Sequence, residues 1–209
     1  MRIGDACALL VVDVQNDFMS GSMAIAGAEA IIEPLSRAGE LFDNVILATD
    51  WHPPGHISFA SAHPGTEPGD SVKVAYGSQK LFPDHCVRGT WGAELVPDLR
   101  LDKSVLLIRK GYRQLVDSFS CFVENDRVTD TGLGAYLRAR GIRRLFCAGL
   151  TRYGCVMKTA MDARGRDFDV IILRDATAGG SKPDIMDKLI AEAGIKWSDT
   201  SLLGRELQL

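Results

Sequence analysis

Apolar runs that alternate with amphipathic stretches dominate the hydropathy pattern of this 209-residue chain. Continuous Val, Ile and Leu content is typical of strands buried on both faces. It occurs at Ala8–Val14, Asn44–Thr49, Ser104–Ile108, Arg144–Ala148 and Asp169–Leu173, with a short edge strand at Ile195–Trp197. Helical periodicity lies between them, at Ala28–Leu41, Gly134–Arg140, Cys155–Arg164 and Pro183–Ala193. This alternation predicts an α/β fold: a single-domain three-layer sandwich around a mostly parallel sheet of about six strands.

One segment, Trp51–Thr90, breaks the alternation, because it is rich in Pro and Gly and has little periodicity. The sequence predicts no regular structure there, and long loops of this kind inside compact domains are commonly functional. All four histidines of the chain fall in this segment, as His52, His56, His63 and His85. The segment is therefore the first place to look for a binding site.

Composition and charge narrow the class of protein. Apolar residues make up 46% and charged residues 24% of the chain, which is ordinary for a globular protein. A formal net charge of -3 gives no reason to expect nucleic acid or a membrane as a partner. The N-terminal apolar run stops at Asp13 and has no signal-peptide cleavage pattern, so we expect a cytoplasmic enzyme. The length suits one domain covering residues 1–209.

The five cysteines are odd in number and lack the spacing of a disulfide framework. Cys7 and Cys147 lie in strand-like runs and are expected to be small buried hydrophobes. Cys155 differs, because a glycine precedes it and a helical pattern follows it. For Cys86 and Cys121 the pattern does not distinguish a packing role from a chemical one.

Three reactive side chains follow predicted strands: Asp13 in LLVVDVQNDF, Lys110 in VLLIRKG and Cys155 in GLTRYGCV. In an open parallel sheet, the carboxyl ends of the strands border one crevice where ligands bind. An acid, a cation and a thiol in one crevice are the parts of a cysteine-nucleophile hydrolase. Each residue also has a structural explanation: a strand end, a solvated lysine and a core cysteine.

Activation of the thiol follows from this grouping. If Cys155 opens a helix, the backbone N–H groups and the helix dipole favour its thiolate. Asp13 can accept the thiol proton, and Lys110 between them can stabilise either anion. The N–H groups of Thr151 and Cys155 are candidates for an oxyanion hole, since two glycines leave room for a sharp turn.

A second cluster has the residue types of a metal site. Asp50 and His52 are two apart at a strand end, so an extended backbone points both side chains to the same side. His85 could return from the far end of the loop, which completes a ligand set suited to zinc, iron or manganese. His56 is either a fourth ligand or a neighbour of the ligands, and His63 is expected at the loop surface. The alternative is that Asp50 and His85 only shape turns.

At this point the motifs resemble a known family, the nicotinamidase/pyrazinamidase branch of the isochorismatase-like cysteine hydrolases. The resemblance rests on DVQNDF, ATDWHPPGHISFASAHPG, LFPDHCVRGTWGAEL, RKG followed by VDSFSCF, and GL…CV, in the family's order. It runs from about Ala8 to Thr177. It implies hydrolysis of nicotinamide, and of pyrazinamide, to the acid and ammonia through a cysteine thioester. Homo-oligomers are frequent among such relatives.

The resemblance also implies roles for individual residues. The catalytic triad would be Asp13, Lys110 and Cys155, and one divalent metal ion, zinc before iron or manganese, would be held by Asp50, His52 and His85. His56 would be a ligand only in some members, and Gln15 would lie near the metal's waters. Phe18, Phe82 and Phe119 would line the slot for the ring, with Thr151 at the reacting amide. The peptide before Thr151 would be cis.

The sequence departs from the family pattern at the nucleophile, where it has GLTRYGCV instead of a form such as GLATDYCV. Gly154 is more similar to the metal-free branch, whose members act on N-carbamoyl or maleamate-like amides. Loss of a bulky aromatic there would enlarge or reshape the acyl pocket, and Arg152 would either meet an anionic group or lie at the surface. The substrate alternative is therefore another amide of the same superfamily. A third class, a binding protein without catalysis, is disfavoured because all three triad positions are filled.

Overall fold

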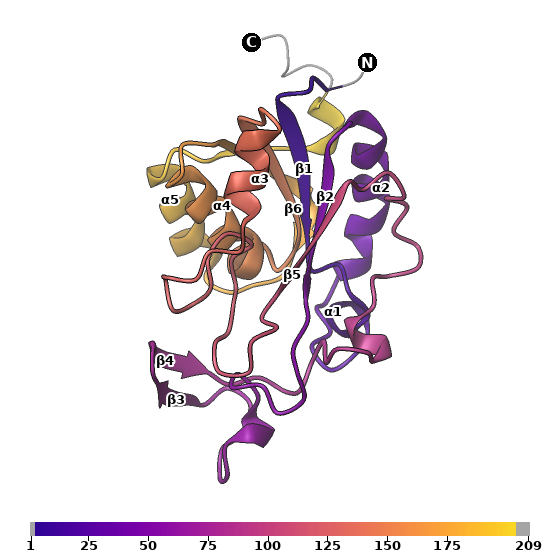
Figure 1. Ribbon diagram of the computed structural model, residues 1–209. Helices are drawn as coiled ribbons and strands as arrows, with labels where there is room; N and C mark the ends of the chain where they lie inside the picture. Colours follow the sequence, from indigo (N-terminus) through magenta and orange to yellow (C-terminus); the bar gives the residue numbers. More distant parts are fainter. Residues whose placement is uncertain (1–2, 204–209) are drawn as a thin grey trace.

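The computed structural model describes residues 3–203, and its centre is a six-stranded sheet in the order β5-β2-β1-β6-β7-β8 (Figure 1). Every pairing within this sheet is parallel. The strands are β1 (Cys7–Val12), β2 (Val45–Asp50), β5 (Leu106–Lys110), β6 (Arg144–Leu150), β7 (Asp169–Ala178) and β8 (Lys196–Ser198). The predicted α/β class and sheet size are confirmed.

Helices cover both faces of the sheet and complete three layers. Figure 1 shows α3, α4 and α5 on one side of the sheet and α1 and α2 on the other. The helices are α1 (Asn16–Met19), α2 (Ile32–Leu41), α3 (Leu133–Ala139), α4 (Met157–Arg164) and α5 (Pro183–Glu192). Because side chains alternate along a strand, β1 supplies Leu9 and Val11 to the core under α2 and Leu10 to the core under α3–α5.

Short 3-10 turns occur as well, and a π-helical turn comes before α4. The 3-10 turns are η1 (Ala28–Ile31), η2 (Ala60–Ala62), η3 (Trp91–Ala93) and η5 (Thr200–Leu202), and the π-helical turn is η4 (Arg152–Val156). The predicted helix Ala28–Leu41 therefore has η1 as its first turn and becomes α-helical at Ile32.

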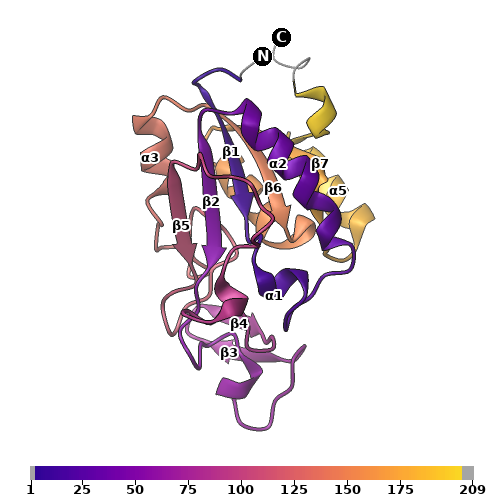
Figure 2. The same cartoon turned by 90° about the vertical axis from the view of Figure 1, so that its right-hand side faces the viewer.

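The segment Trp51–Thr90 is more ordered than the sequence predicts. It contains an antiparallel hairpin of β3 (Ser71–Val74) and β4 (Gly77–Lys80), and η2 precedes it. The prediction of a segment without regular structure was wrong because these strands are short and polar, and Gln79 is their one buried residue. Figure 2 shows the hairpin beyond the carboxyl ends of the sheet strands.

The expectation that every strand is buried on both faces was wrong for β5. This strand lies at the edge of the sheet, and Leu107 is 44% exposed. Because an edge strand lacks a neighbouring strand on one side, the apolar side chains of β5 are less buried than those of the central strands. In β1 and β6 every residue is buried except Arg144, which is partly exposed.

One glycine allows β6 to approach β1 closely at the crevice. Gly149 has φ +105°, and a Cβ there would lie 2.0 Å from the carbonyl oxygen of Val12. The pairing of β6 with β7 is irregular at the same place, between Cys147 and Gly149.

Within residues 3–203, no helix is long and apolar enough to cross a membrane. That one domain covers all of residues 1–209 stays a prediction, because residues 1–2 and 204–209 lie outside the described part.

Candidate active site

The carboxyl ends of three adjacent strands bring the charged side chains together. Asp13 directly follows β1, whereas Asp50 and Lys110 are the last residues of β2 and β5. Asp50 and Lys110 are also direct partners in the parallel pairing of those strands. Asp13 has a left-handed backbone at φ 54°, which aspartate tolerates better than most residues. The crevice predicted from strand ends is thus present, and these three side chains share it.

Lys110 is the centre of the cluster, and its ammonium is fully buried. Its Nζ lies 2.8 Å from Asp13 Oδ2 and 2.5 Å from Asp50 Oδ1. It also donates to the Cys155 sulfur at 3.5 Å and to the Ser118 carbonyl at 3.3 Å. Burial opposes a charge here, but the two carboxylates overcome it and hold the pKa of Lys110 well above its usual range.

The two carboxylates differ in their proton affinity. Burial, and then the nearby charge of Asp50, raise the pKa of Asp13 to about 7, although Lys110 opposes both effects. Burial also acts on Asp50, but Lys110 and the neighbouring His52 and His85 outweigh it and lower its pKa. In the structure, Asp13 is therefore the carboxylate better able to take up and release a proton near neutral pH.

Cys155 lies in η4, one turn before the regular helix. Because α4 begins at Met157, the predicted helix start at Cys155 was wrong by two residues. The expectation of a thiolate stabilised by the helix was also wrong: burial raises the pKa of the Cys155 thiol well above its usual value, and the charge of Asp13 adds to this while Lys110 opposes it. The thiol is neutral at rest and has to lose its proton to a neighbouring base before it can attack a carbonyl.

The geometry of Asp50, His52 and His85 fits a divalent metal. Their ligand atoms lie within 4.8 Å of one another, with His52 Nε2 3.8 Å and His85 Nε2 4.0 Å from the Asp50 carboxylate. Donors on one zinc ion are at most about 4.2 Å apart, because each bond is roughly 2.1 Å long.

The hydrogen bonds of the Nδ1 atoms of His52 and His85 also fit metal binding through Nε2. His52 Nδ1 is 2.8 Å from the Gly111 carbonyl, and His85 Nδ1 is 2.8 Å from the Pro83 carbonyl. A carbonyl can only accept, so each Nδ1 carries a proton, and in a neutral ring Nε2 then has the lone pair that a metal needs. Burial lowers the pKa of His52 to about 4, which keeps this ring neutral as a ligand must be.

The other two histidines and Gln15 lie around this cluster. The His56 ring stacks on His52 at 4.2 Å between centroids, and its Nδ1 is 2.7 Å from Ser58 Oγ. His63 is partly exposed and hydrogen-bonds the Ile57 carbonyl at 2.8 Å, as expected for the loop surface. The Gln15 side chain makes two 2.8 Å hydrogen bonds with the backbone of Asp50, so it holds the carboxyl end of β2 in place.

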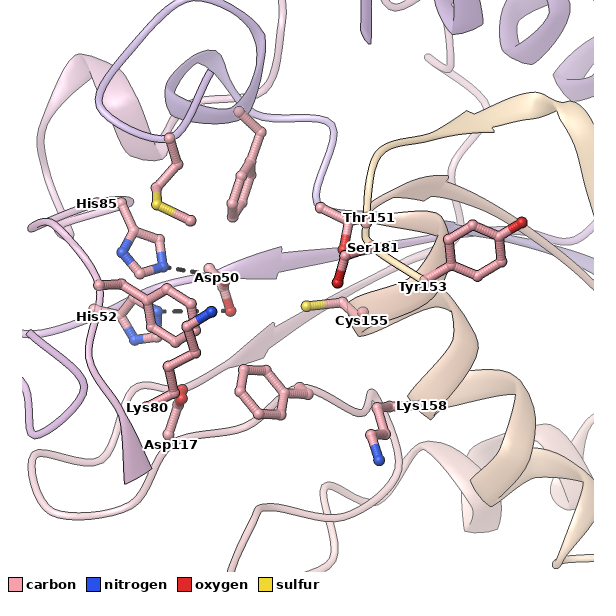
Figure 3. Close-up of a pocket in the computed structure, with 16 residues that line it drawn as sticks. Asp50, His52, Lys80, His85, Asp117, Thr151, Tyr153, Cys155, Lys158 and Ser181 are labelled. Carbon is pink, nitrogen blue, oxygen red and sulfur yellow. Dashed lines mark ion pairs between the residues drawn. The ribbon is translucent and has the colours of Figure 1, made fainter. Parts of the chain in front are cut away.

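A cavity of about 360 Å³ extends from the Cys155 thiol to Asp50, His52 and His85, which are called the metal-type cluster below. Figure 3 shows the Cys155 sulfur pointing into it from one end and Asp50, His52 and His85 at the other. Three phenylalanines line the cavity, as predicted: Phe18, Phe82 and Phe119. The rings of Phe82 and Phe119 contact each other edge to face, with 6.3 Å between their centroids. A cavity of this volume is typical of small-molecule sites.

The cavity has further lining residues that the sequence analysis missed. Asp117 is buried and accepts a hydrogen bond from Gln79 of β4 at 2.9 Å. Lys80 on β4 and Lys158 on α4 line the cavity together with Tyr153. Asp117 lies within VDSFSCF, one of the motifs that carry the family resemblance, and this position could have indicated it. Nothing in the sequence places Lys80 there, since the hairpin itself was not predicted.

The unusual turn before the nucleophile is packed rather than open. A Cβ on Gly154 would lie 2.2 Å from Thr151 Oγ1, so the threonine hydroxyl occupies the space beside Gly154. Gly154 itself lines the cavity, and the expected enlargement or reshaping of the acyl pocket stays a prediction. Arg152 turns away from the cavity and donates to Thr177 Oγ1 at 2.9 Å and to the carbonyls of Thr177 and Arg174. The Leu150–Thr151 peptide is cis, as the resemblance implies.

Comparison with known proteins agrees with this geometry. The isochorismatase domain family matches residues 7–193. A nicotinamidase from Acinetobacter baylyi is 46% identical over 177 residues, which cover 84% of this chain and 83% of that protein. The structure of a nicotinamidase/pyrazinamidase from Acinetobacter baumanii superimposes with a TM-score of 0.94 at 39% identity, covering 97% of this chain and 100% of that one.

Two further structures contain relevant small molecules or ions. PnC1 from L. infantum in complex with nicotinate has a TM-score of 0.84 at 32% identity and covers 96% of both chains. Pyrazinamidase from Pyrococcus horikoshii in complex with zinc has a TM-score of 0.77 at 29% identity, with 93% of this chain and 99% of that chain covered. On the family match and these similarities, the chain belongs to the isochorismatase domain family and, within it, to the nicotinamidase-like amidohydrolases.

Proposed function

We propose that this protein hydrolyses nicotinamide, and pyrazinamide with it, to the corresponding acid and ammonia. The observation that carries the proposal is the set of contacts made by the buried Lys110 ammonium with Asp13, Asp50 and the Cys155 sulfur. The nucleophile and the metal-type cluster line one cavity, and these contacts connect the buried base Asp13 to both of them. The nicotinamidases among the relatives support the choice of substrate.

In the proposed reaction, the Cys155 sulfur attacks the carboxamide carbon while Asp13 takes the thiol proton. The C–S bond forms, the C–N bond breaks, and Asp13 returns the proton to the nitrogen, which leaves as ammonia. Water then hydrolyses the thioester and yields the acid and the free thiol. Lys110 stabilises the negative charge as it moves between sulfur and carboxylate, because it lies within hydrogen-bonding distance of both.

The oxyanion that forms during each step needs donors fixed beside the thiol. We assign the backbone N–H groups of Thr151 and Cys155 to this role, as the sequence predicts. Support comes from the rigid surroundings of the turn: Arg152 makes three hydrogen bonds to the end of β7, and Tyr153 donates to Asp187 at 3.0 Å. Donors that do not have to reorganise are the effective ones in an oxyanion hole.

The ring of the substrate would lie between the phenylalanines. Phe18 and Phe82 each contact the His85 ring edge to face, with 5.7 and 5.8 Å between ring centroids, and Phe82 also contacts Phe119. The aromatic surface therefore extends from the metal-type cluster toward the thiol. Rings pack well against such edges and faces.

Asp50, His52 and His85 would hold one divalent metal ion, with zinc proposed before iron or manganese. Two neutral imidazoles and a carboxylate suit all three metals, and the zinc complex of the P. horikoshii relative supports zinc. When bound, the metal supplies a Lewis acid that fixes the ring nitrogen of the substrate. We propose that His56 lies beside the ligands rather than among them, and the support for this is that its ring stacks on His52 and has both nitrogens near protein oxygens.

Ammonia release from a panel of amides by the metal-replete protein tests the proposal. The panel contains nicotinamide, pyrazinamide, an N-carbamoyl amide and maleamate. We expect the two ring amides to be hydrolysed. Activity confined to the N-carbamoyl amide or maleamate would instead favour the alternative amidase indicated by Gly154, and no activity on any amide would reject both.

Three accompanying assignments stay predictions. They are a cytoplasmic location, a homo-oligomeric state, and a place in the salvage of pyridine nucleotides. Size measurement in solution tests the second, and cell fractionation tests the first. The third follows from the substrate, since nicotinate is a precursor from which such nucleotides can be rebuilt.

A further inference from the structure

The side chain of Thr151 presents a hydroxyl to the cavity without a partner in the protein. Within residues 3–203, the fully buried side-chain oxygens or nitrogens without a hydrogen bond are the two oxygens of Asp13, which instead forms an ion pair with Lys110, and Thr151 Oγ1 is not among these buried atoms. Thr151 is half-buried and lines the cavity together with Cys155, and its Oγ1 makes no hydrogen bond to another described residue. The hydroxyl therefore has accessible surface and an unused donor at the end of the cavity where the thiol lies.

The hydroxyl of Thr151 points to the side of the turn that leads to the nucleophile. Thr151 Oγ1 lies on the side of Gly154, 2.2 Å from the position of a Cβ there, and Thr151 Cγ2 lies on the side of Gly179, 3.5 Å from the corresponding position. The methyl group therefore faces Gly179, and the hydroxyl faces the residue that precedes Cys155.

The backbone of Thr151 is held in the turn that carries the nucleophile. Its carbonyl accepts from the N–H groups of Gly154 at 3.0 Å and Val156 at 3.1 Å, which closes the turn onto Cys155. Figure 3 shows Thr151 on the same side of the cavity as the Cys155 thiol and opposite Lys80 and Asp117. Thr151, Gly154 and Cys155 line the same end of the cavity, so a substrate whose carbonyl carbon reaches the sulfur brings the neighbouring atoms of its ring to Thr151.

We propose that the Thr151 hydroxyl donates a hydrogen bond to an acceptor atom in the ring position ortho to the carboxamide. This makes Thr151 a specificity-determining residue that favours ring amides with an ortho nitrogen over those with an ortho C–H. The inference rests on the proposed function, because it takes Cys155 to attack the carboxamide carbon. The ring atoms nearest to that carbon are the ring carbon that bears it and the two ortho positions, so a donor beside Cys155 meets an ortho atom.

Pyrazinamide and nicotinamide form a matched pair for the test. Both have a ring nitrogen meta to the carboxamide, but only pyrazinamide has a second nitrogen ortho to it. The measured quantity is the ratio of kcat/KM for pyrazinamide to kcat/KM for nicotinamide. Comparison of each variant with the unchanged protein cancels the intrinsic difference in reactivity between the two amides.

Thr151→Val removes the hydroxyl and keeps the shape, whereas Thr151→Ser keeps the hydroxyl. We expect T151V to lower the ratio roughly threefold to tenfold, the effect of one neutral hydrogen bond, and T151S to preserve it. An unchanged ratio in T151V would overturn the inference. An equal loss for both amides would overturn it too, since the hydroxyl would then act on the shared carboxamide. If the unchanged protein hydrolyses neither amide, the failure belongs to the proposed function.

A second measurement does not depend on the folding of a Thr151 variant. In a crystal structure of Cys155→Ala with pyrazinamide bound, we expect the ortho nitrogen within hydrogen-bonding distance of Thr151 Oγ1. A pyrazinamide ring whose ortho nitrogen faces away from Thr151 would overturn the inference as well.

Discussion

The contact between Thr151 and Gly154 makes a quantitative prediction for three variants: Gly154→Ala, Thr151→Ala and the double variant. In G154A, the new Cβ would lie 2.2 Å from Thr151 Oγ1, about 1.2 Å closer than the 3.4 Å at which ordinary contact begins. Overpacking of this kind costs about 1–3 kcal/mol. T151A removes Oγ1, and the next atom of residue 151, its Cβ, is already at an ordinary 3.6 Å.

The double variant should therefore recover most of the unfolding free energy that G154A loses. We expect a coupling free energy of about 1–2 kcal/mol in the cycle, within the range seen for residues in contact. Activity should show the same pattern, because Cys155 adjoins Gly154 and a displacement of about 1 Å at a reacting group can cost on the order of 100-fold in rate.

Urea denaturation and ammonia release on all four proteins measure the cycle. The slope of the unfolding free energy against urea should stay constant, so that the midpoints report stability. Gly165→Ala is a matched control: it follows α4, and its Cβ would meet only ordinary contacts, the nearest at 3.6 Å. If T151A/G154A is no more stable than G154A, the hydroxyl is not the reason for glycine at this position.

Three other perturbations test the remaining parts of the site. Cys155→Ala should abolish ammonia release while metal content measured by mass spectrometry stays unchanged; residual turnover would reject the thiol mechanism. Lys110→Met should abolish activity and lower the unfolding free energy by about 3–5 kcal/mol, because it leaves two buried carboxylates without their cation; a variant as stable as the parent would contradict this. Chelation should abolish activity and lower Tm, and His52→Ala and His85→Ala should reduce bound metal, whereas His63→Ala should not; equal metal loss in all three variants would reject the assigned ligands.

Much of the fold could be predicted because its strands are long, apolar and central. Residues of β1 and β6 are buried almost throughout, so their hydrophobic runs are continuous and easily recognised. The β3–β4 hairpin and α1 could not be recognised in the same way. The strands β3 and β4 and the helix α1 are each only four residues long, and contacts with distant parts of the chain order them, such as the hydrogen bond between Gln79 and Asp117.

The sequence predicted which residues meet in the site better than it predicted their pKa values. Strand ends and motifs indicated which side chains meet, but not how deeply they are buried. Burial reverses the expected effect on the Cys155 thiol, whose pKa is raised rather than lowered. The contact of Lys110 with Asp50 was also missed, because it depends on the register between β2 and β5, which the sequence does not reveal.

That missed contact joins the two halves of the site. The sequence analysis placed Lys110 with Asp13 and Cys155, and assigned Asp50 to a separate metal cluster. In the structure one ammonium lies between the carboxylates, and ligand atoms of Asp13, Asp50 and Cys155 lie within 4.8 Å of one another. Two anions this close in a buried site require a cation between them, and its removal would raise the proton affinity of both. Lys110 therefore favours the ionised form of Asp50, which is the form that the proposed metal needs, and it also limits the rise in the pKa of Asp13 that burial causes. A basic Asp13 and an anionic Asp50 can exist side by side because they share this lysine, and His52 and His85 add to the stabilisation of the charge on Asp50.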